Sequence, residues 1–188
     1  MKLILKSKRL ILRPPKFSDA PILEKYINDK LVSQWMLNVP YPYPRGDYKK
    51  WIKKSLKNSK NKESFDFTIN FNQEPIGSVG LCRVEWKYKK AIIGYWLAKK
   101  YWNQGIMTEA LKLLLDFGFN QLKLNRLESS HFKQNQGSKR VQEKCGLKLE
   151  GIARQGIFKN GKFYDDVRRA ILLSEYKKLK KKWKAKKL

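Results

Sequence analysis

One segment limits the fold of this chain more than any other: an apolar strand, a glycine-bearing loop and a helix follow one another. Residues 91–97 are almost continuously apolar, as in a buried central strand. A helix is expected from Thr108 to about Asn120, because its apolar residues recur at helical spacing. With Gly105 in the loop between them, free backbone N–H groups and the positive helix end point in one direction. This arrangement predicts a site for phosphate or pyrophosphate.

The rest of the sequence alternates between strand and helix patterns. We expect strands at 9–13, 65–71, 75–81, 126–132, 153–158 and 166–172, and helices from about 19 to 28, from 47, and from 137 or 138 to 145. Asn160-Gly161 predicts a tight hairpin turn between the last two strands. No repeat or Gly/Ser linker interrupts this order, so we predict a single mixed α/β domain over residues 1–174.

Composition narrows the functional classes. The 188 residues include 43 basic and 16 acidic ones, a net charge of +27, which favours polyanionic partners such as nucleic acid, ribosomes, anionic lipid or a polyphosphate cofactor. No apolar run approaches the roughly 20 residues that cross a bilayer, and lysines interrupt the N-terminus too early for a signal peptide. Two cysteines and one histidine do not suffice for a disulfide framework or a zinc site. We therefore expect a soluble cytoplasmic protein without a metal.

The composition changes after Ser174. Residues 175–188 carry eight lysines, and Tyr176, Leu179 and Trp183 recur at a spacing that puts them on one helical face. We expect a solvated, lysine-rich C-terminal extension. Contact of this extension with a ribosome, RNA or lipid is the alternative.

Several segments carry a family resemblance. Residues 94–111, GYWLAKKYWNQGIMTEAL, resemble the acetyl-CoA-binding motif of the GNAT acetyltransferase superfamily, and more narrowly its RimJ/RimL branch. Residues 135–151, the hairpin at 160–165 and the opening 9–20 are similar to further elements of that branch, in the same order. The resemblance covers nearly the whole chain except the lysine-rich tail. It implies the GNAT fold, a mixed, mostly antiparallel sheet flanked by helices, and acetyl transfer from acetyl-CoA to a primary amine.

The resemblance also implies which residues bind acetyl-CoA. They are Trp96, Leu97, Ala98, Trp102, Asn103, Gln104, Gly105, Ile106, Met107, Thr108, Asn135, Ser138 and Lys144. Two of them depart from the family pattern: Trp102 stands where Arg or Gln is usual, and Met107 replaces a small residue. Because backbone amides bind the pyrophosphate, neither change need abolish binding.

The catalytic residues are less completely specified. The tyrosine that many superfamily members use as general acid falls at Gln142, so the resemblance implies Ser138 of the Asn-x-x-Ser motif as the group that protonates or hydrogen-bonds the leaving thiolate. A helix N-cap is the alternative role of Ser138. His131 is our candidate general base because of its intrinsic pKa. A packing role for His131, a base function of Glu128 or Asp165, and proton relay by solvent remain open.

Three functions remain open at this stage. The leading one is an acetyl-CoA-dependent N-acetyltransferase that acts on a protein N-terminus, of the ribosomal-protein type. Similar proteins are commonly homodimers, so a homodimer is a further expectation. The second is a small-molecule amine acetyltransferase for an antibiotic, amino acid or polyamine. Its acceptor pocket would use the first two helices, residues 35–45 and the 153–170 hairpin. The third is a catalytically silent module that binds RNA or the ribosome through lysines.

Overall fold

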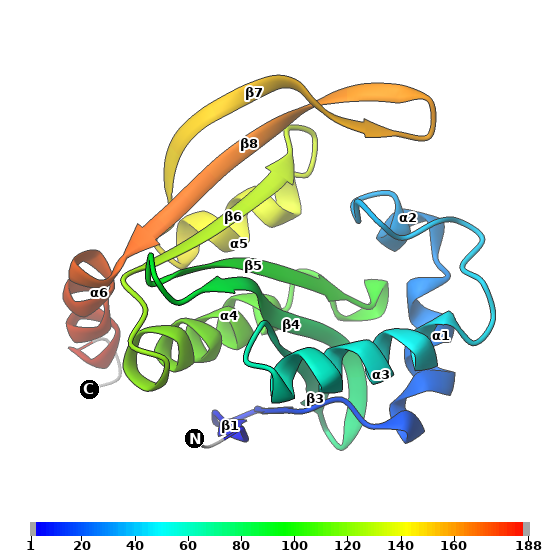
Figure 1. Ribbon diagram of the computed structural model, residues 1–188, viewed down its shortest axis with the longest axis horizontal. Helices are drawn as coiled ribbons and strands as arrows, with labels where there is room; N and C mark the ends of the chain where they lie inside the picture. The colour runs from blue at the N-terminus through cyan, green and yellow to red at the C-terminus, as the bar shows by residue number, and fades with distance from the viewer. Residues whose placement is uncertain (1–2, 186–188) are drawn as a thin grey trace.

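A single twisted sheet organises the molecule (Figure 1). The computed structural model describes residues 3–185. Its strands, in the spatial order β1-β2-β3-β4-β5-β6-β8-β7, are β1 (Leu5–Lys6), β2 (Leu10–Arg13), β3 (Phe65–Phe71), β4 (Glu74–Glu85), β5 (Lys90–Leu97), β6 (Arg126–Phe132), β7 (Lys148–Lys159) and β8 (Lys162–Leu172). The helices are α1 (Ala20–Ile27), α2 (Lys30–Ser33), α3 (Asp47–Lys60), α4 (Ile106–Asp116), α5 (Gln136–Lys144) and α6 (Leu173–Ala185).

The pairing of the strands confirms a mixed, mostly antiparallel sheet flanked by helices. All neighbouring strands run antiparallel except β5 and β6, which run parallel. Their parallel ladder is short and joins only Lys90–Ile92 to Arg126–Glu128. Beyond Ile92 the two strands are no longer paired within the described structure, so the sheet opens between them.

Side chains of β5 enter two different cores. Ile93 and Leu97 pack in the larger core with α4, whereas Trp96 packs in a smaller core with α1 and α3. Successive side chains of a strand point to opposite faces, so these two cores lie on opposite sides of the sheet. The continuously apolar stretch predicted as a central strand is therefore buried on both faces.

Most predicted elements form with shifted ends. The helix expected from Thr108 begins at Ile106, because Gly105 adopts a left-handed φ of +73° and ends the loop there. The helix expected at 137 or 138 begins at Gln136. The short α2 lay in a stretch for which we had no prediction. No described helix has the length and apolarity needed to span a membrane.

The expectation of a solvated C-terminal extension is wrong for the apolar face of α6. Tyr176 is 2% exposed, stacks on Phe119 with ring centroids 4.9 Å apart, and donates a 2.6 Å hydrogen bond to the carboxylate of Asp116. Leu179 and Trp183 pack against the same core. The three apolar side chains whose spacing is seen in the sequence therefore pack this helix against the domain, and the exposed lysines lie on its other side. The domain limits of 1–174 and 175–188 stay a prediction.

Candidate active site

The loop from β5 to α4 has the geometry of an anion site. The first hydrogen bond of α4 runs from the Glu109 N–H to the Gly105 carbonyl, at 3.0 Å. The N–H groups of Ile106, Met107 and Thr108 therefore precede the helical ladder, at the positive end of the helix. These three donors and the glycine before them form the site that the sequence predicts for a pyrophosphate.

The two departures from the family pattern do not obstruct this loop. Met107 is buried in the core under α4. The indole N–H of Trp102 donates to the Leu97 carbonyl at 2.8 Å and holds the loop against the end of β5. The bulky side chains thus serve packing and loop closure, and the backbone donors remain available.

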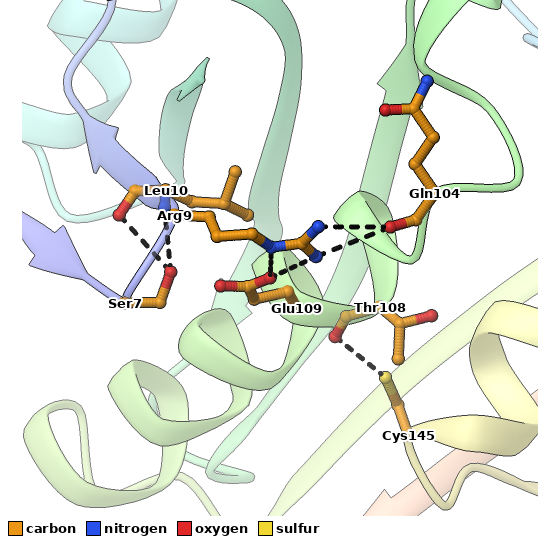
Figure 2. A network of polar contacts seen from close by, with 7 residues as sticks. All are labelled: Ser7, Arg9, Leu10, Gln104, Thr108, Glu109 and Cys145. Atoms are coloured by element: carbon orange, nitrogen blue, oxygen red, sulfur yellow. Dashed lines mark hydrogen bonds and ion pairs between the residues drawn. The ribbon is translucent and has the colours of Figure 1, made fainter. Parts of the chain in front are cut away.

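Arg9, which sequence analysis placed only in a strand, contacts this loop (Figure 2). Its guanidinium donates two hydrogen bonds to the Glu109 carboxylate, at 2.8 and 2.6 Å, and approaches the Gln104 carbonyl at 3.5 Å. Burial opposes ionisation of Glu109, but hydrogen bonds from Ser7 and Arg9 outweigh it, so the net pKa of this carboxyl is lowered. Arg9 therefore ties β2 to both the loop and the first turn of α4. On the other side, the Cys145 thiol contacts the Thr108 carbonyl at 3.5 Å.

The opening between β5 and β6 offers a second part of the site. The backbone of residues 93–97 is not paired with β6 in the described structure, although one side-chain contact, Ser129 Oγ to the Ile93 carbonyl at 3.3 Å, crosses the gap. Unpaired strand backbone can hydrogen-bond an extended amide-bearing chain in place of a neighbouring strand. The pantetheine arm of acetyl-CoA is such a chain, and its pyrophosphate would reach the start of α4. The residues present thus fit acetyl-CoA.

Ser138 lies at the first turn of α5 but does not cap it, so the N-cap alternative is wrong. Asn135 is the N-cap, and its side-chain oxygen accepts the Ser138 N–H at 3.0 Å. The hydroxyl of Ser138 is instead 2.6 Å from the hydroxyl of Tyr95 and 3.2 Å from Gln142 Nε2. This polar cluster, made of Tyr95, Ser129, Ser138 and Gln142, joins the start of α5 to the opened strands.

Tyr95 is the member of this cluster whose side chain the sequence did not lead us to expect here. It comes from the middle of β5, and burial raises the pKa of its hydroxyl to about 12, although hydrogen bonds with Ser138 and Gln142 oppose the rise. The sequence does contain a signal for this position. Tyr95 lies midway between the inward-facing Ile93 and Leu97, so its side chain must point to the same face of the strand and bring a polar hydroxyl there. The hydrogen-bond partner of that hydroxyl comes from a helix some forty residues later in the chain, so the local sequence did not identify it.

His131 lies on β6 and is 5% exposed. Its Nδ1 is 2.9 Å from the carbonyl of Phe132, which can only accept, so Nδ1 carries the proton and Nε2 keeps a free lone pair. Burial lowers the pKa of His131 below 6.5, so the ring is neutral at physiological pH. Nε2 has no hydrogen-bond partner among the described atoms. These properties suit a base, but no hydrogen bond within the described residues joins His131 to the Ser138 cluster, and its role stays a prediction.

The two alternative carboxylates are engaged elsewhere. Glu128 forms an ion pair with Arg126 at 2.7 Å. Asp165 pairs with Lys133 at 3.1 Å and accepts the Gln155 N–H at 3.1 Å, and this backbone hydrogen bond is the main reason why its pKa is lowered. Ion pairing makes both carboxylates weaker candidates for a base than His131.

The remaining predicted binding residues occupy three kinds of position. Trp96 points into the core with α1 and α3, so it could reach a ligand at the strand opening only through its backbone. The Ala98 N–H donates to the Ile76 carbonyl at 2.9 Å, and the Gln104 side chain donates to the Lys100 carbonyl at 2.9 Å. Asn103 and Lys144 are exposed, the first with a left-handed φ of +61°.

A second feature lies where the tip of the β7–β8 hairpin extends toward α2 (Figure 1). Lys159, only 9% exposed, donates to the carbonyls of Ser33 at 3.0 Å and Val39 at 2.9 Å, and also to that of Met36. Burial lowers the pKa of its ammonium group. A shallow groove of about 310 Å³ runs between residues 37–40 and 158–160. Contacts of the hairpin with the 33–39 loop thus shape an open surface.

Comparison with known proteins agrees with this geometry. The chain matches the acetyltransferase (GNAT) domain family over residues 9–148. It is 34% identical over 175 residues to the probable N-acetyltransferase YjcK of Bacillus subtilis, covering 90% of this chain and 97% of the relative. It is 30% identical over 148 residues to the ribosomal-protein-serine acetyltransferase of Escherichia coli, covering 78% and 82%.

A solved structure supports the fold. RimL, the ribosomal L7/L12 alpha-N-protein acetyltransferase, in complex with coenzyme A, superposes with a TM-score of 0.82 at 24% identity, covering 90% of this chain and 97% of RimL. The loop before α4, the opened strands and these matches agree with one another. The chain therefore belongs to the GNAT acetyltransferase family and is an N-acetyltransferase whose acetyl donor is acetyl-CoA.

Proposed function

We propose that this enzyme acetylates the α-amino group of a protein N-terminus, of the ribosomal-protein type, in the cytoplasm. The observation that carries the proposal is the open groove between residues 37–40 and 158–160. An extended peptide end can lie in a shallow groove of this kind, whereas a small molecule is usually held in a more enclosed pocket. The named activity of the Escherichia coli relative supports the same acceptor class.

Three aromatic rings pack together beside the segments that form this groove. Phe132, at the end of β6, packs edge-on against Trp35 at 5.9 Å and against Tyr164 at 5.4 Å between ring centroids. Trp35 belongs to the loop after α2, Tyr164 belongs to β8, and Ser138 follows Phe132 by six residues. We propose that an acceptor in the groove approaches the start of α5 along these rings.

Protonation equilibria favour an N-terminus over a lysine side chain. The amine must be neutral to attack, and an α-amino group with a pKa of about 8 is roughly one-tenth neutral at pH 7, against fewer than about one in a thousand for lysine. The charge of +27 also disfavours basic acceptors such as polyamines. We therefore expect a neutral or acidic N-terminal sequence as the acceptor.

The proposal assigns a role to each of the chain's own groups, and the positions of these groups support the assignment. Acetyl-CoA supplies the acetyl group as a thioester. A backbone N–H of residues 95–97 donates to the carbonyl oxygen as negative charge develops there. His131 Nε2, directly or through water, takes the proton of the amine. Ser138 donates a hydrogen bond to the leaving sulfur.

A panel of acceptors tests the proposal. Peptides with a free N-terminus should be acetylated with kcat/KM at least about tenfold above the same peptides with a blocked N-terminus and a free lysine, since only the former amine is appreciably neutral. Acidic and basic versions of one peptide should rank in that order. Preference for spermidine or another small amine would contradict the proposal, and tight acetyl-CoA binding without transfer to any amine would favour the silent module.

A further inference from the structure

Gln142 is fully buried, and its side-chain nitrogen faces four oxygens. The distances from Nε2 are 3.1 Å to Ser129 Oγ, 3.2 Å to the Tyr95 hydroxyl, 3.2 Å to Ser138 Oγ and 3.4 Å to the Ser130 carbonyl. The Ser130 carbonyl can only accept a hydrogen bond. Ser129 Oγ already donates to the Ile93 carbonyl, so it too accepts from the amide. These two partners require that the NH₂ end of Gln142, not its oxygen, face the cluster.

This orientation sets the direction of the hydrogen bonds to the two remaining hydroxyls. Nε2 has two protons for its four oxygen neighbours and no lone pair to accept with, so neither Tyr95 nor Ser138 can donate to it. The two hydroxyls lie 2.6 Å apart, so one of them donates to the other. If Tyr95 donates to Ser138 Oγ, the Ser138 proton is left over for a partner outside the cluster. In the reverse order Tyr95 would have to donate to the Ser138 carbonyl, at a longer 3.4 Å. The 2.6 Å contact is present in both orders, but the phenol is the more acidic donor and the 3.4 Å contact lies outside the usual range for O–H···O bonds, so the first order is favoured.

We propose that Tyr95 and Gln142 are positioning residues that direct the Ser138 O–H away from the protein and toward the sulfur of bound CoA. This inference rests on the role of Ser138 in the proposed function. In the reaction the C–N bond forms, the C–S bond breaks with its electron pair on sulfur, and the proton of the amine passes to the base. The directed Ser138 hydroxyl stabilises the thiolate by a hydrogen bond. Glutamine at 142, in place of the family's tyrosine, then has a chemical use.

The pKa of the thiol of bound CoA reports this hydrogen bond without any acceptor. It is measured from the pH dependence of CoA alkylation by iodoacetamide at saturating protein, with the product separated by chromatography. A hydrogen bond donated to the thiolate lowers its pKa. Ser138→Ala should therefore raise the thiol pKa by about 0.5 to 1 unit, and Tyr95→Phe, which keeps the ring, should raise it by a similar amount.

A double-mutant cycle separates positioning from structural damage. In the Ser138→Ala background, Tyr95→Phe should cause no further shift, because its effect passes through Ser138. Ser130→Ala is the matched control: it removes an exposed hydroxyl, keeps the carbonyl that meets Gln142, and should leave the thiol pKa unchanged. CoA affinity and melting temperature, measured for each variant, should stay close to wild type.

Either of two results would overturn the inference. The first is that Tyr95→Phe shifts the thiol pKa equally in the wild type and in the Ser138→Ala background. The second is that Ser138→Ala shifts the thiol pKa whereas Tyr95→Phe does not. No shift from Ser138→Ala would remove Ser138 from the thiolate and the inference with it. That outcome leaves the acceptor proposal standing, because the assay contains no amine acceptor.

Discussion

The proposed acetyl-CoA side and the proposed acceptor side of this enzyme are held together by different kinds of contact. On the acetyl-CoA side, β5, the following loop and α4 are consecutive in the chain, and the groups proposed to bind are backbone N–H groups. On the acceptor side, Lys159 joins the hairpin tip to carbonyls 120 to 126 residues earlier. Backbone binding tolerates side-chain replacements such as Trp102 and Met107. A surface formed by distant side chains changes with each substitution, which suits the part that selects the acceptor.

Substitution of Lys159 should produce the largest difference between the two sides. Lys159→Met leaves three loop carbonyls without their charged donor, and a buried unsatisfied group costs about 1–3 kcal/mol, so the 33–39 loop should loosen. We expect KM for the acceptor to rise about tenfold or more, with the Kd of acetyl-CoA changed less than about twofold. Initial rates and calorimetry measure the two quantities. Lys162→Met, at an exposed position of the same hairpin, is the control.

If Lys159→Met weakened the binding of acetyl-CoA as strongly as the binding of the acceptor, the two sides would not be separable. The comparison between them would then fail, and the Lys159 contacts would belong to the stability of the whole domain.

Arg9→Gln should give the converse pattern with a smaller effect. The variant removes both hydrogen bonds to Glu109 and the contact with the Gln104 carbonyl, so the loop before α4 loses its tie to β2. We expect the Kd of acetyl-CoA to rise about three- to tenfold, roughly the worth of one charge-assisted hydrogen bond, with acceptor KM little changed. Lys8→Gln removes the same charge one residue away, outside this network. An equal loss in Lys8→Gln would show that general charge, not the loop contact, is responsible.

The smallest expected effect is the contribution of His131 to the pH dependence of the protein's stability. Its pKa is lowered by burial, so its contribution to stability is fully present above the unfolded value of about 6.5 and is lost as pH falls through the folded pKa. The stability advantage of the wild type over His131→Asn should therefore shrink between pH 8 and pH 5. Melting curves across this range measure it. A constant difference would mean that His131 does not titrate differently on folding.

The His131→Asn variant also tests the catalytic role of His131, through the pH dependence of kcat/KM. Protonation of the acceptor amine already lowers kcat/KM below about pH 8. If His131 is the base, a second acid limb should appear with an apparent pKa below 6.5, and this limb should change in His131→Asn while the Kd of acetyl-CoA does not. An unaltered acid limb would assign the proton to solvent.

Elements defined by local patterns could be predicted almost residue by residue. Residues 65–71 and 126–132 form strands with the predicted limits, because alternation and flanking breakers specify a strand locally. Helix starts differed by one or two residues, because Gly105 and Asn135 each begin a helix earlier than its apolar pattern. The larger errors were strand ends: the strands predicted at 75–81, 153–158 and 166–172 extend four or five residues further at one end. The lysine count of residues 175–188 hid the more informative feature, the spacing of Tyr176, Leu179 and Trp183.

The amino-acid sequence alone determined the strand order along the chain, the loop that presents N–H groups at α4, and the family to which these motifs belong. Those properties depend on neighbours within about one element, and a linear pattern specifies them. Only the tertiary structure decided that Tyr95 and Gln142 converge on Ser138, that Arg9 contacts the loop at Gln104, and that Lys159 lies buried against the 33–39 loop. Each of these contacts joins side chains from separate elements, and their meeting depends on how the whole sheet packs.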